Sequence, residues 1–227
     1  MHNSAPSMNH FFRAHPWHGV AIGENAPEIL TCYIEIVPTD TVKYELDKES
    51  GFLKVDRPQK YSNYCPALYG LVPQTYCAKH VGDFCSFKTG IPGIMGDADP
   101  LDICVLVEKP ILRSDILMEV IPIGGLRTID RHESDDKIIA VLKGDLVYGH
   151  ITDIRQCPSH LIERLKHYFL TYKDCPGEST TQHMEIKAVY GREEAHEVIR
   201  MAQKDYKENF SGIWNEHQEI SKNGRTK

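Results

Sequence analysis

Three apolar runs of strand length constrain the fold of this chain more than any other feature. They occupy residues 103–107, 116–123 and 138–142, and turns containing proline, glycine and charged residues separate them. Short strands at such spacing are typical of a sheet that closes into a barrel, because closure leaves no strand edge exposed. The sequence therefore predicts a closed antiparallel β-barrel at the centre of the fold.

Two stretches nearer the N-terminus also predict strands. Residues 32–37 are apolar except for Glu35, a single charge inside the run. Residues 42–46 alternate apolar and charged side chains, and extended structure resumes at 52–57 after a five-residue loop, which predicts a β-hairpin. Lys43 and Glu45 share one face of that hairpin. In isolation, such a pair is usually an exposed charge pair.

Two amphipathic helices are predicted in the second half of the chain. The first begins at Pro158-Ser159, ends at Tyr172-Lys173 and carries an apolar stripe at the helical period. The second spans residues 193–210, and its stripe consists of Ala195, Val198, Ile199, Ala202 and Tyr206. Strands and helices together predict a mainly-β α+β fold.

We interpret residues 1–227 as one domain. Residues 1–31 lack a sustained period and are interpreted as an N-terminal arm over the domain surface, anchored by Trp17 and the pair Phe11-Phe12.

Three other segments carry weaker signals. Residues 58–76 contain three prolines and four tyrosines, which predicts irregular backbone. Residues 77–96 are interpreted as an insertion, and residues 215–227 as a polar C-terminal tail.

Composition restricts the partners and the compartment. The net charge of −6 argues against a nucleic-acid backbone as the main partner. The seven cysteines are odd in number and include no Cys-x-x-Cys pair, so neither a disulfide framework nor a zinc ribbon is indicated. No run of about 18 apolar residues is present to span a membrane. We expect a soluble cytoplasmic protein.

The motif Asp97-Ala98-Asp99-Pro100-Leu101-Asp102 places three carboxylates in six residues, directly before an apolar run. Carboxylates this close repel one another and Pro100 fixes the bend between them, so cations are needed to neutralise them. The motif is therefore typical of a metal site. The alternative is an acidic turn before a strand, because Asp and Pro are ordinary turn residues.

A second acidic loop, residues 130–137, would be a solvated turn if considered alone. Combined with the motif, with Glu35 and with Lys, Arg and Tyr at element ends, it favours metal-assisted attack of water on a phosphate. Carboxylates without His or Cys fit Mg²⁺, with Mn²⁺ as a substitute, better than zinc. A metal would activate the water, a carboxylate would accept its proton, and the basic groups would hold phosphate oxygens.

Two other features do not support a site. Gly82 followed by Lys88-Thr89 differs from a phosphate-binding loop, because Phe87 stands where the second glycine should be. The arm contains His10, His15 and His18, but no nearby carboxylate or Cys completes a metal set, so surface histidines are favoured.

The acidic motif resembles the Asp-x-Asp-Pro-x-Asp signature of the soluble family I inorganic pyrophosphatases, and the resemblance extends from about residue 32 to 173. It includes Ile34-Glu35-Ile36, Lys43-Tyr44-Glu45-Leu46-Asp47-Lys48-Glu49-Ser50-Gly51, Val55-Asp56-Arg57, Tyr69-Gly70 and Tyr172-Lys173. Pro16-Trp17-His18 resembles the arm of the longer, eukaryotic-type members. The resemblance implies a five-stranded, OB-like closed β-barrel with flanking helices, and a homo-oligomer.

The resemblance also implies an activity and a role for each matched residue. The activity would be Mg²⁺-dependent hydrolysis of inorganic pyrophosphate to two orthophosphates by a metal-bridged hydroxide, with Asp99 as general base. The implied metal ligands are Asp97, Asp102, Asp130, Asp135 and Glu35. The implied substrate-binding residues are Lys43, Arg57, Lys137, Tyr172 and Lys173, with Glu45 and Tyr69 also in the site, and Tyr172 and Lys173 also take part in catalysis.

One position departs from the family pattern, and two rival functions are considered. Cys65 stands where many members carry a site tyrosine, so that contribution is absent or comes from Tyr64. Cys65 could be a redox-sensitive thiol, but a small packing residue is favoured. One rival is an OB-fold nucleic-acid protein, which needs a basic groove. The other is a retired enzyme kept as a scaffold. Every matched charged position is chemically intact, which argues against this second rival.

Overall fold

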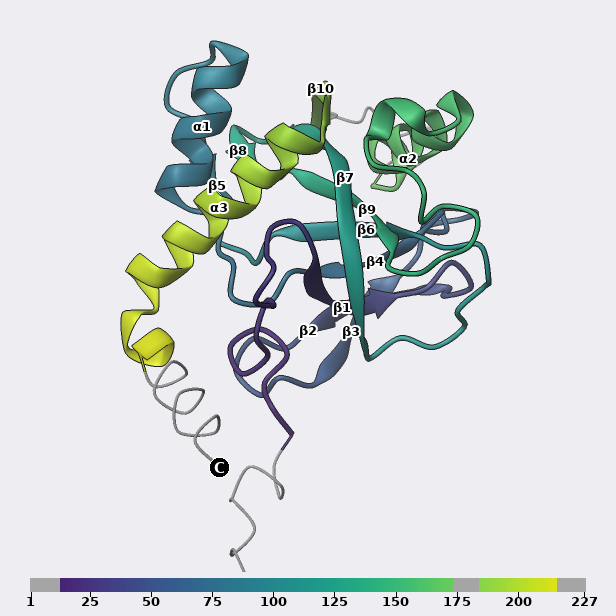
Figure 1. Ribbon diagram of the computed structural model, residues 1–227, viewed down its shortest axis with the longest axis horizontal. Coiled ribbons are helices and arrows are strands. Elements are labelled where there is room, and N and C mark those ends of the chain that lie inside the picture. The colour runs from purple at the N-terminus through teal and green to yellow at the C-terminus, as the bar shows by residue number, and fades with distance from the viewer. Residues whose placement is uncertain (1–12, 174–183, 216–227) are drawn as a thin grey trace, which may run out of the picture.

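A computed structural model describes residues 13–173 and 184–215 of the chain (Figure 1). Within these ranges the elements follow one another as β1 Leu30–Ile36, β2 Val42–Leu46, β3 Leu53–Pro58, β4 Leu68–Leu71, α1 Lys79–Thr89, β5 Met95–Gly96, β6 Asp102–Leu106, β7 Ile116–Asp130, β8 Glu133–Ser134, β9 Lys137–Leu142, the 3-10 helix η2 Ile154–Gln156, α2 Ser159–Thr171, β10 Met184–Gly191 and α3 Arg192–Asn209.

Most of the strands belong to one sheet, and β2 and β3 form a separate hairpin. The order within the sheet includes β1-β4-β6-β9-β7, and β7 pairs again with β1, so the pairings of these strands return to their start. The mainly-β α+β class is confirmed, whereas the OB-like closed barrel stays a prediction.

The expectation that all the strands pair antiparallel was wrong. β6 and β9 are parallel. β7, which lies between them in the chain, pairs antiparallel with the other side of β9. This parallel register has consequences for the site described below.

The predicted strands are present, but the extents of some of them differ from the prediction. The hairpin loop has six residues, 47–52, where five were expected. β7 continues to Asp130, because a register shift between Pro122 and Gly124 absorbs the break in its apolar pattern.

Four strands were not predicted, and two of them, β5 and β8, have only two residues each. β4 lies inside residues 58–76, which were expected to be irregular, and this expectation was wrong. A strand of only four residues is stabilised here by pairing with β1 on one side and β6 on the other, and the local sequence carries no sign of this. β10 pairs with the second half of β7.

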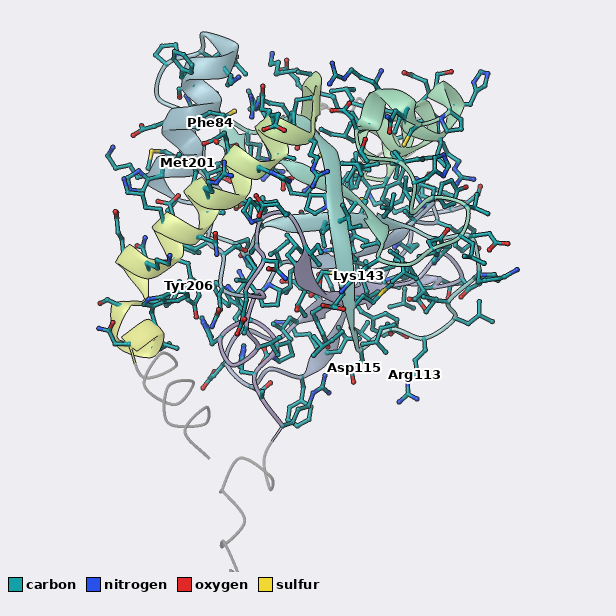
Figure 2. The ribbon with its side chains drawn as sticks, in the orientation of Figure 1. Phe84, Arg113, Asp115, Lys143, Met201 and Tyr206 are labelled. Carbon is teal, nitrogen blue, oxygen red and sulfur yellow. The ribbon has the colours of Figure 1, made fainter. Side chains whose placement is uncertain are left out.

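The helices pack around the sheet. In Figure 1, α1 and α3 lie on the left of the sheet and α2 lies on the right. The predicted apolar stripe of α3 is buried, and Phe84 of α1 and Met201 of α3 both pack against the main core (Figure 2). None of the helices in the described ranges combines the length and apolar character that crossing a membrane requires.

The described part of the N-terminal arm is anchored by Trp17. Its side chain is 4% exposed, and its indole N–H donates to the Thr75 carbonyl at 2.7 Å. Arg13 pairs with Asp115 through both guanidinium nitrogens. Phe11, Phe12 and His10 lie outside the described residues, as does the tail beyond residue 215.

Asp205 connects α3 to the start of α1. Its buried carboxylate accepts hydrogen bonds from the backbone N–H groups of Ala78, His80 and Val81, each at 3.0 Å. These N–H groups belong to the first turn of a helix, where no carbonyl of the same helix is in reach. The carboxylate therefore caps one helix from another.

We predict that Asp205→Ala lowers the free energy of unfolding by about 3 kcal/mol, because three backbone N–H donors, one buried and two part-buried, lose a charged acceptor. Urea denaturation measures the change. Asp83→Ala is the control: Asp83 is exposed on α1 and pairs with Lys79, so a change within about 0.5 kcal/mol is expected. Equal losses in the two variants would contradict the capping role.

Candidate active site

One cavity, of about 280 Å³, collects most of the charged residues that the sequence singled out. Among the described residues, eight carboxylates line it, from Glu35, Glu45, Asp97, Asp99, Asp102, Asp130, Glu133 and Asp135, against the ammonium groups of Lys43, Lys48, Lys137 and Lys173. Tyr44, Leu46, Tyr69, Leu71, Pro100 and Tyr172 complete the lining. The charged side chains of this described lining therefore carry a formal excess of four negative charges.

The centre of the cavity is set by strand register. Asp102, the first residue of β6, lies opposite Leu71 of β4 on one side and Lys137 of β9 on the other. Tyr69 is two residues from Leu71, so it faces the same side of the sheet. The Tyr69 hydroxyl and the Lys137 ammonium both donate to the Asp102 carboxylate, and Lys137 also donates to Asp135.

The loop before β6 is held against residue 77. A β-carbon on Gly96 would come within 2.2 Å of the Cys77 carbonyl carbon, so this close approach requires glycine. The Ala98 N–H donates to the Cys77 carbonyl at 2.9 Å, and the Cys77 N–H donates to the Asp99 carbonyl at 2.8 Å. The Asp99 N–H donates to the Asp97 side chain at 3.1 Å. Hydrogen bonds thus hold the acidic motif in a loop that faces the cavity. An ordinary solvated turn would lack this support.

Burial disfavours the charged form of three of these carboxylates, those of Asp97, Asp135 and Glu35. The pKa of Asp97 is raised well above its usual value by burial, and the nearby Asp135 and Asp102 raise it further. Burial also raises the pKa of Asp135, although Lys137 opposes the change. Burial raises the pKa of Glu35 to about 8, although the Leu46 N–H donates to its carboxylate at 2.6 Å.

Lys137 and Lys43 remain charged although they are largely buried. Burial alone would lower the pKa of Lys137, but Asp102 and Asp135 outweigh burial and raise it well above the usual value. Burial would also lower the pKa of Lys43, but Asp56 and Glu45 outweigh burial and raise it. The site therefore offers fixed positive charges among carboxylates that are only partly neutralised.

All the site residues expected from the sequence line this cavity except Arg57. Arg57 lies beside it: its guanidinium pairs with Asp56 at 2.5 Å, and its central carbon is 5.9 Å from the centre of the Tyr172 ring. The Lys173 ammonium is 5.4 Å from the same ring and donates to Asp130 at 2.5 Å. The chemical role of each residue stays a prediction.

The structure adds Tyr44, Lys48 and Glu133 to the lining. Glu133 lies within the second acidic loop, so the composition of that loop was a usable signal. Lys48 lies in a charged hairpin loop, which by itself indicates only a solvated turn.

Cys65 does not contribute to the cavity. It is fully buried in the core that contains Tyr168, and burial raises the pKa of its thiol to about 12, which favours packing over redox chemistry. Tyr64 is exposed and is not part of the lining, so it does not replace the missing site tyrosine.

The donor set of the cavity fits a hard divalent cation. Among the described residues that line it, every anionic group is a carboxylate, and imidazole and thiolate are absent. Within the described residues, no three His, Cys, Asp or Glu side chains converge closely enough to hold an ion by themselves. Mg²⁺ usually keeps several waters and takes only one or two carboxylates, so it suits such a loosely gathered set.

A sequence model of the family described as inorganic pyrophosphatase matches residues 32–207, most of the chain. The chain belongs to the inorganic pyrophosphatase family. As an inorganic diphosphatase, it is a hydrolase that acts on a phosphoric anhydride.

Named relatives support the family assignment. The inorganic pyrophosphatase of Chlamydia trachomatis is 55% identical over 197 residues, which cover 85% of this chain and 94% of the relative. The soluble inorganic pyrophosphatase 3 of Arabidopsis thaliana is 36% identical, over 86% of this chain and 80% of that protein. The crystal structure of the Thermus thermophilus inorganic pyrophosphatase matches with a TM-score of 0.71 and 28% identity, covering 85% of this chain and 99% of that one.

We predict that Asp97→Asn stabilises the metal-free pyrophosphatase. The substitution keeps an oxygen acceptor for the Asp99 N–H and removes a charge repelled by Asp135 and Asp102. In EDTA the free energy of unfolding should rise by about 1 kcal/mol or more. With MgCl₂, the melting temperature of the wild type should rise more than that of the variant.

Asp47→Asn is the control of opposite sign. Hydrogen bonds from Ser50 and Lys54 lower the pKa of Asp47 to about 2, so its charge is favourable and its loss should destabilise the protein. An Asp97→Asn protein less stable than the wild type in EDTA would refute the repulsion argument.

Proposed function

We propose that this cavity hydrolyses inorganic pyrophosphate to two orthophosphates in a reaction that requires Mg²⁺. The observation that carries the proposal is the lining of the cavity, in which a carboxylate excess surrounds separate ammonium groups. The carboxylates suit divalent cations, and the ammonium groups suit the oxygens of a phosphate. Mn²⁺ is a substitute of the same ligand preference.

In this proposal, Asp97, Asp102, Asp130, Asp135 and Glu35 hold the metal ions. When bound, Mg²⁺ supplies charge neutralisation for the phosphates and lowers the pKa of water in its coordination shell. Asp99 accepts the proton of the attacking water. Its side chain is 45% exposed, so it is open to water in a way that the buried Lys137 and Glu35 are not.

Basic and phenolic side chains bind the substrate in this proposal. Lys43, on β2, and Lys137, on β9, bind phosphate oxygens. Arg57 approaches the substrate beside Tyr172. Lys173, next to the same ring, holds the departing orthophosphate and stabilises the charge that develops on it. Glu45 and Tyr69 orient Lys43 and Asp102, to which they are ion-paired and hydrogen-bonded respectively.

Orthophosphate release from pyrophosphate tests the proposal. The purified protein should release phosphate with MgCl₂, and excess EDTA should stop the release. Binding of pyrophosphate without turnover would favour a retired enzyme. A salt-sensitive gel shift of single-stranded DNA without phosphate release would favour the OB-fold rival, which the negative lining of the cavity opposes.

We predict that Asp99→Asn lowers kcat by roughly 100-fold or more, because it removes the proton acceptor. Mg²⁺ should still raise the melting temperature of the variant, because the proposed ligands remain. Asp83→Asn, on the exposed face of α1, should have the kcat of the wild type. Wild-type turnover in Asp99→Asn would defeat the assignment of the base.

Further properties of the fold, the assembly and the partners belong to the same proposal. The pyrophosphatase is a single domain of residues 1–227, with arm 1–31, insertion 77–96 and tail 215–227, and the ring of pairings through β1 supports an OB-like closed barrel. It acts as a homo-oligomer in the cytoplasm. It has no nucleic-acid or membrane partner.

A further inference from the structure

The N-terminal arm contacts the hairpin loop that carries Lys48. The His15 Nε2 lies 3.2 Å from the backbone carbonyl oxygen of Lys48. The backbone N–H groups of Trp17 and His18 donate to His15 Nδ1 at 3.2 and 3.3 Å. Because Nδ1 accepts, the ring proton is on Nε2, which therefore donates to Lys48.

Glycine allows this contact. Gly51 has a φ of +72°, in the left-handed region, and a β-carbon there would lie 2.8 Å from the His15 ring. Within the loop, Asp47 accepts hydrogen bonds from the Ser50 N–H at 3.0 Å and from its hydroxyl at 2.6 Å. Hydrogen bonds within the loop therefore set its conformation, and the contact with the arm sets its position.

The same arm also contacts the backbone behind the acidic motif. Besides the bond from the Trp17 indole to the Thr75 carbonyl, the Gln74 N–H donates to the Trp17 carbonyl at 2.9 Å. The Thr75 hydroxyl accepts from the Leu101 N–H at 3.0 Å. Residues 15–17 thus join the loop of Lys48 to the segment that supports residues 99–102.

The consequence of this clamp is an ion pair at the edge of the cavity. The Lys48 ammonium, whose side chain is 44% exposed, donates to the Asp99 carboxylate. Lys48 is not in the expected set of substrate-binding residues, yet it lines the cavity. In a reaction that uses Asp99 as proton acceptor, the ammonium has to leave that carboxylate, and phosphate oxygens are the anionic partners that the substrate brings.

We propose that Lys48 is a further pyrophosphate-binding residue of this site, and that His15 is a positioning residue that acts through it. The proposal rests on the proposed function. On substrate entry the ammonium exchanges Asp99 for phosphate oxygens, which binds the substrate and leaves the carboxylate free. The N-terminal arm is accordingly part of the substrate-binding machinery.

The test compares Lys48→Met with Lys143→Met. Lys143 (labelled in Figure 2) is also 44% exposed and pairs with a carboxylate, Glu119 at 3.0 Å, but it does not line the cavity. Lys48→Met should raise the KM for magnesium pyrophosphate about tenfold with kcat changed by less than about threefold, because one charge-assisted contact to substrate is lost. Lys143→Met should match the wild type, and Lys48→Arg should restore most of the affinity.

Binding provides a second readout. The Kd for methylenediphosphonate with Mg²⁺, measured by calorimetry, should rise by a similar factor in Lys48→Met. If KM and Kd of Lys48→Met equal those of Lys143→Met, Lys48 does not bind substrate. Wild-type protein without phosphate release would instead mean that the proposed function has failed, so the two failures are distinguishable.

A double variant tests the link to His15. His15→Ala should raise the KM about threefold, and His15→Gln, whose amide can donate to the same carbonyl, should restore it. In the Lys48→Met background, His15→Ala should have no further effect on KM, because its influence passes through the missing ammonium. Additive effects of the two substitutions would overturn the positioning role.

Discussion

The ion pair of Lys137 with Asp102, across the parallel strands β6 and β9, is the interaction on which the rest of the site depends. An ammonium with 2% exposure costs several kcal/mol to bury unless carboxylates and hydrogen bonds compensate it. Asp102 and Asp135 provide that compensation. In return, the ammonium offsets part of the repulsion that would otherwise separate these carboxylates from Asp97. The register of β6 and β9 therefore also sets the electrostatics of the site.

The charge excess that remains suits a cation-assisted reaction on an anion. A cavity lined by more carboxylates than ammonium groups repels a free polyphosphate and attracts divalent ions, so substrate and metal are expected to bind together. The sign of this charge also separates the site from nucleic-acid-binding OB-folds, which present basic grooves. A fold alone does not decide between these two kinds of site, and the side chains do.

Support for the site comes from behind the sheet as well as from the arm. Arg127 is 1% exposed, lies between the rings of Phe84 and Tyr190 at 5.2 and 5.0 Å, and pairs with Asp136 at 3.2 Å. Asp136 stands between two lining residues of the cavity. Through the contact of Phe84 with Arg127, α1, which lies within residues 77–96, helps to support the second acidic loop.

Much of the fold was determined by the sequence itself. Apolar runs and amphipathic stripes predicted most strands and two helices, because alternation and helical period are local consequences of burial. The motif from Asp97 to Asp102 indicated oxygen ligands for a cation, because three carboxylates in six residues repel one another. Only the tertiary structure decided that β9 runs parallel to β6, that β4 and β10 are strands, that Arg57 lies beside the cavity, and that Lys48 lines it. These features depend on hydrogen bonds and ion pairs between segments tens of residues apart, and local sequence patterns do not specify which distant backbone will be the partner.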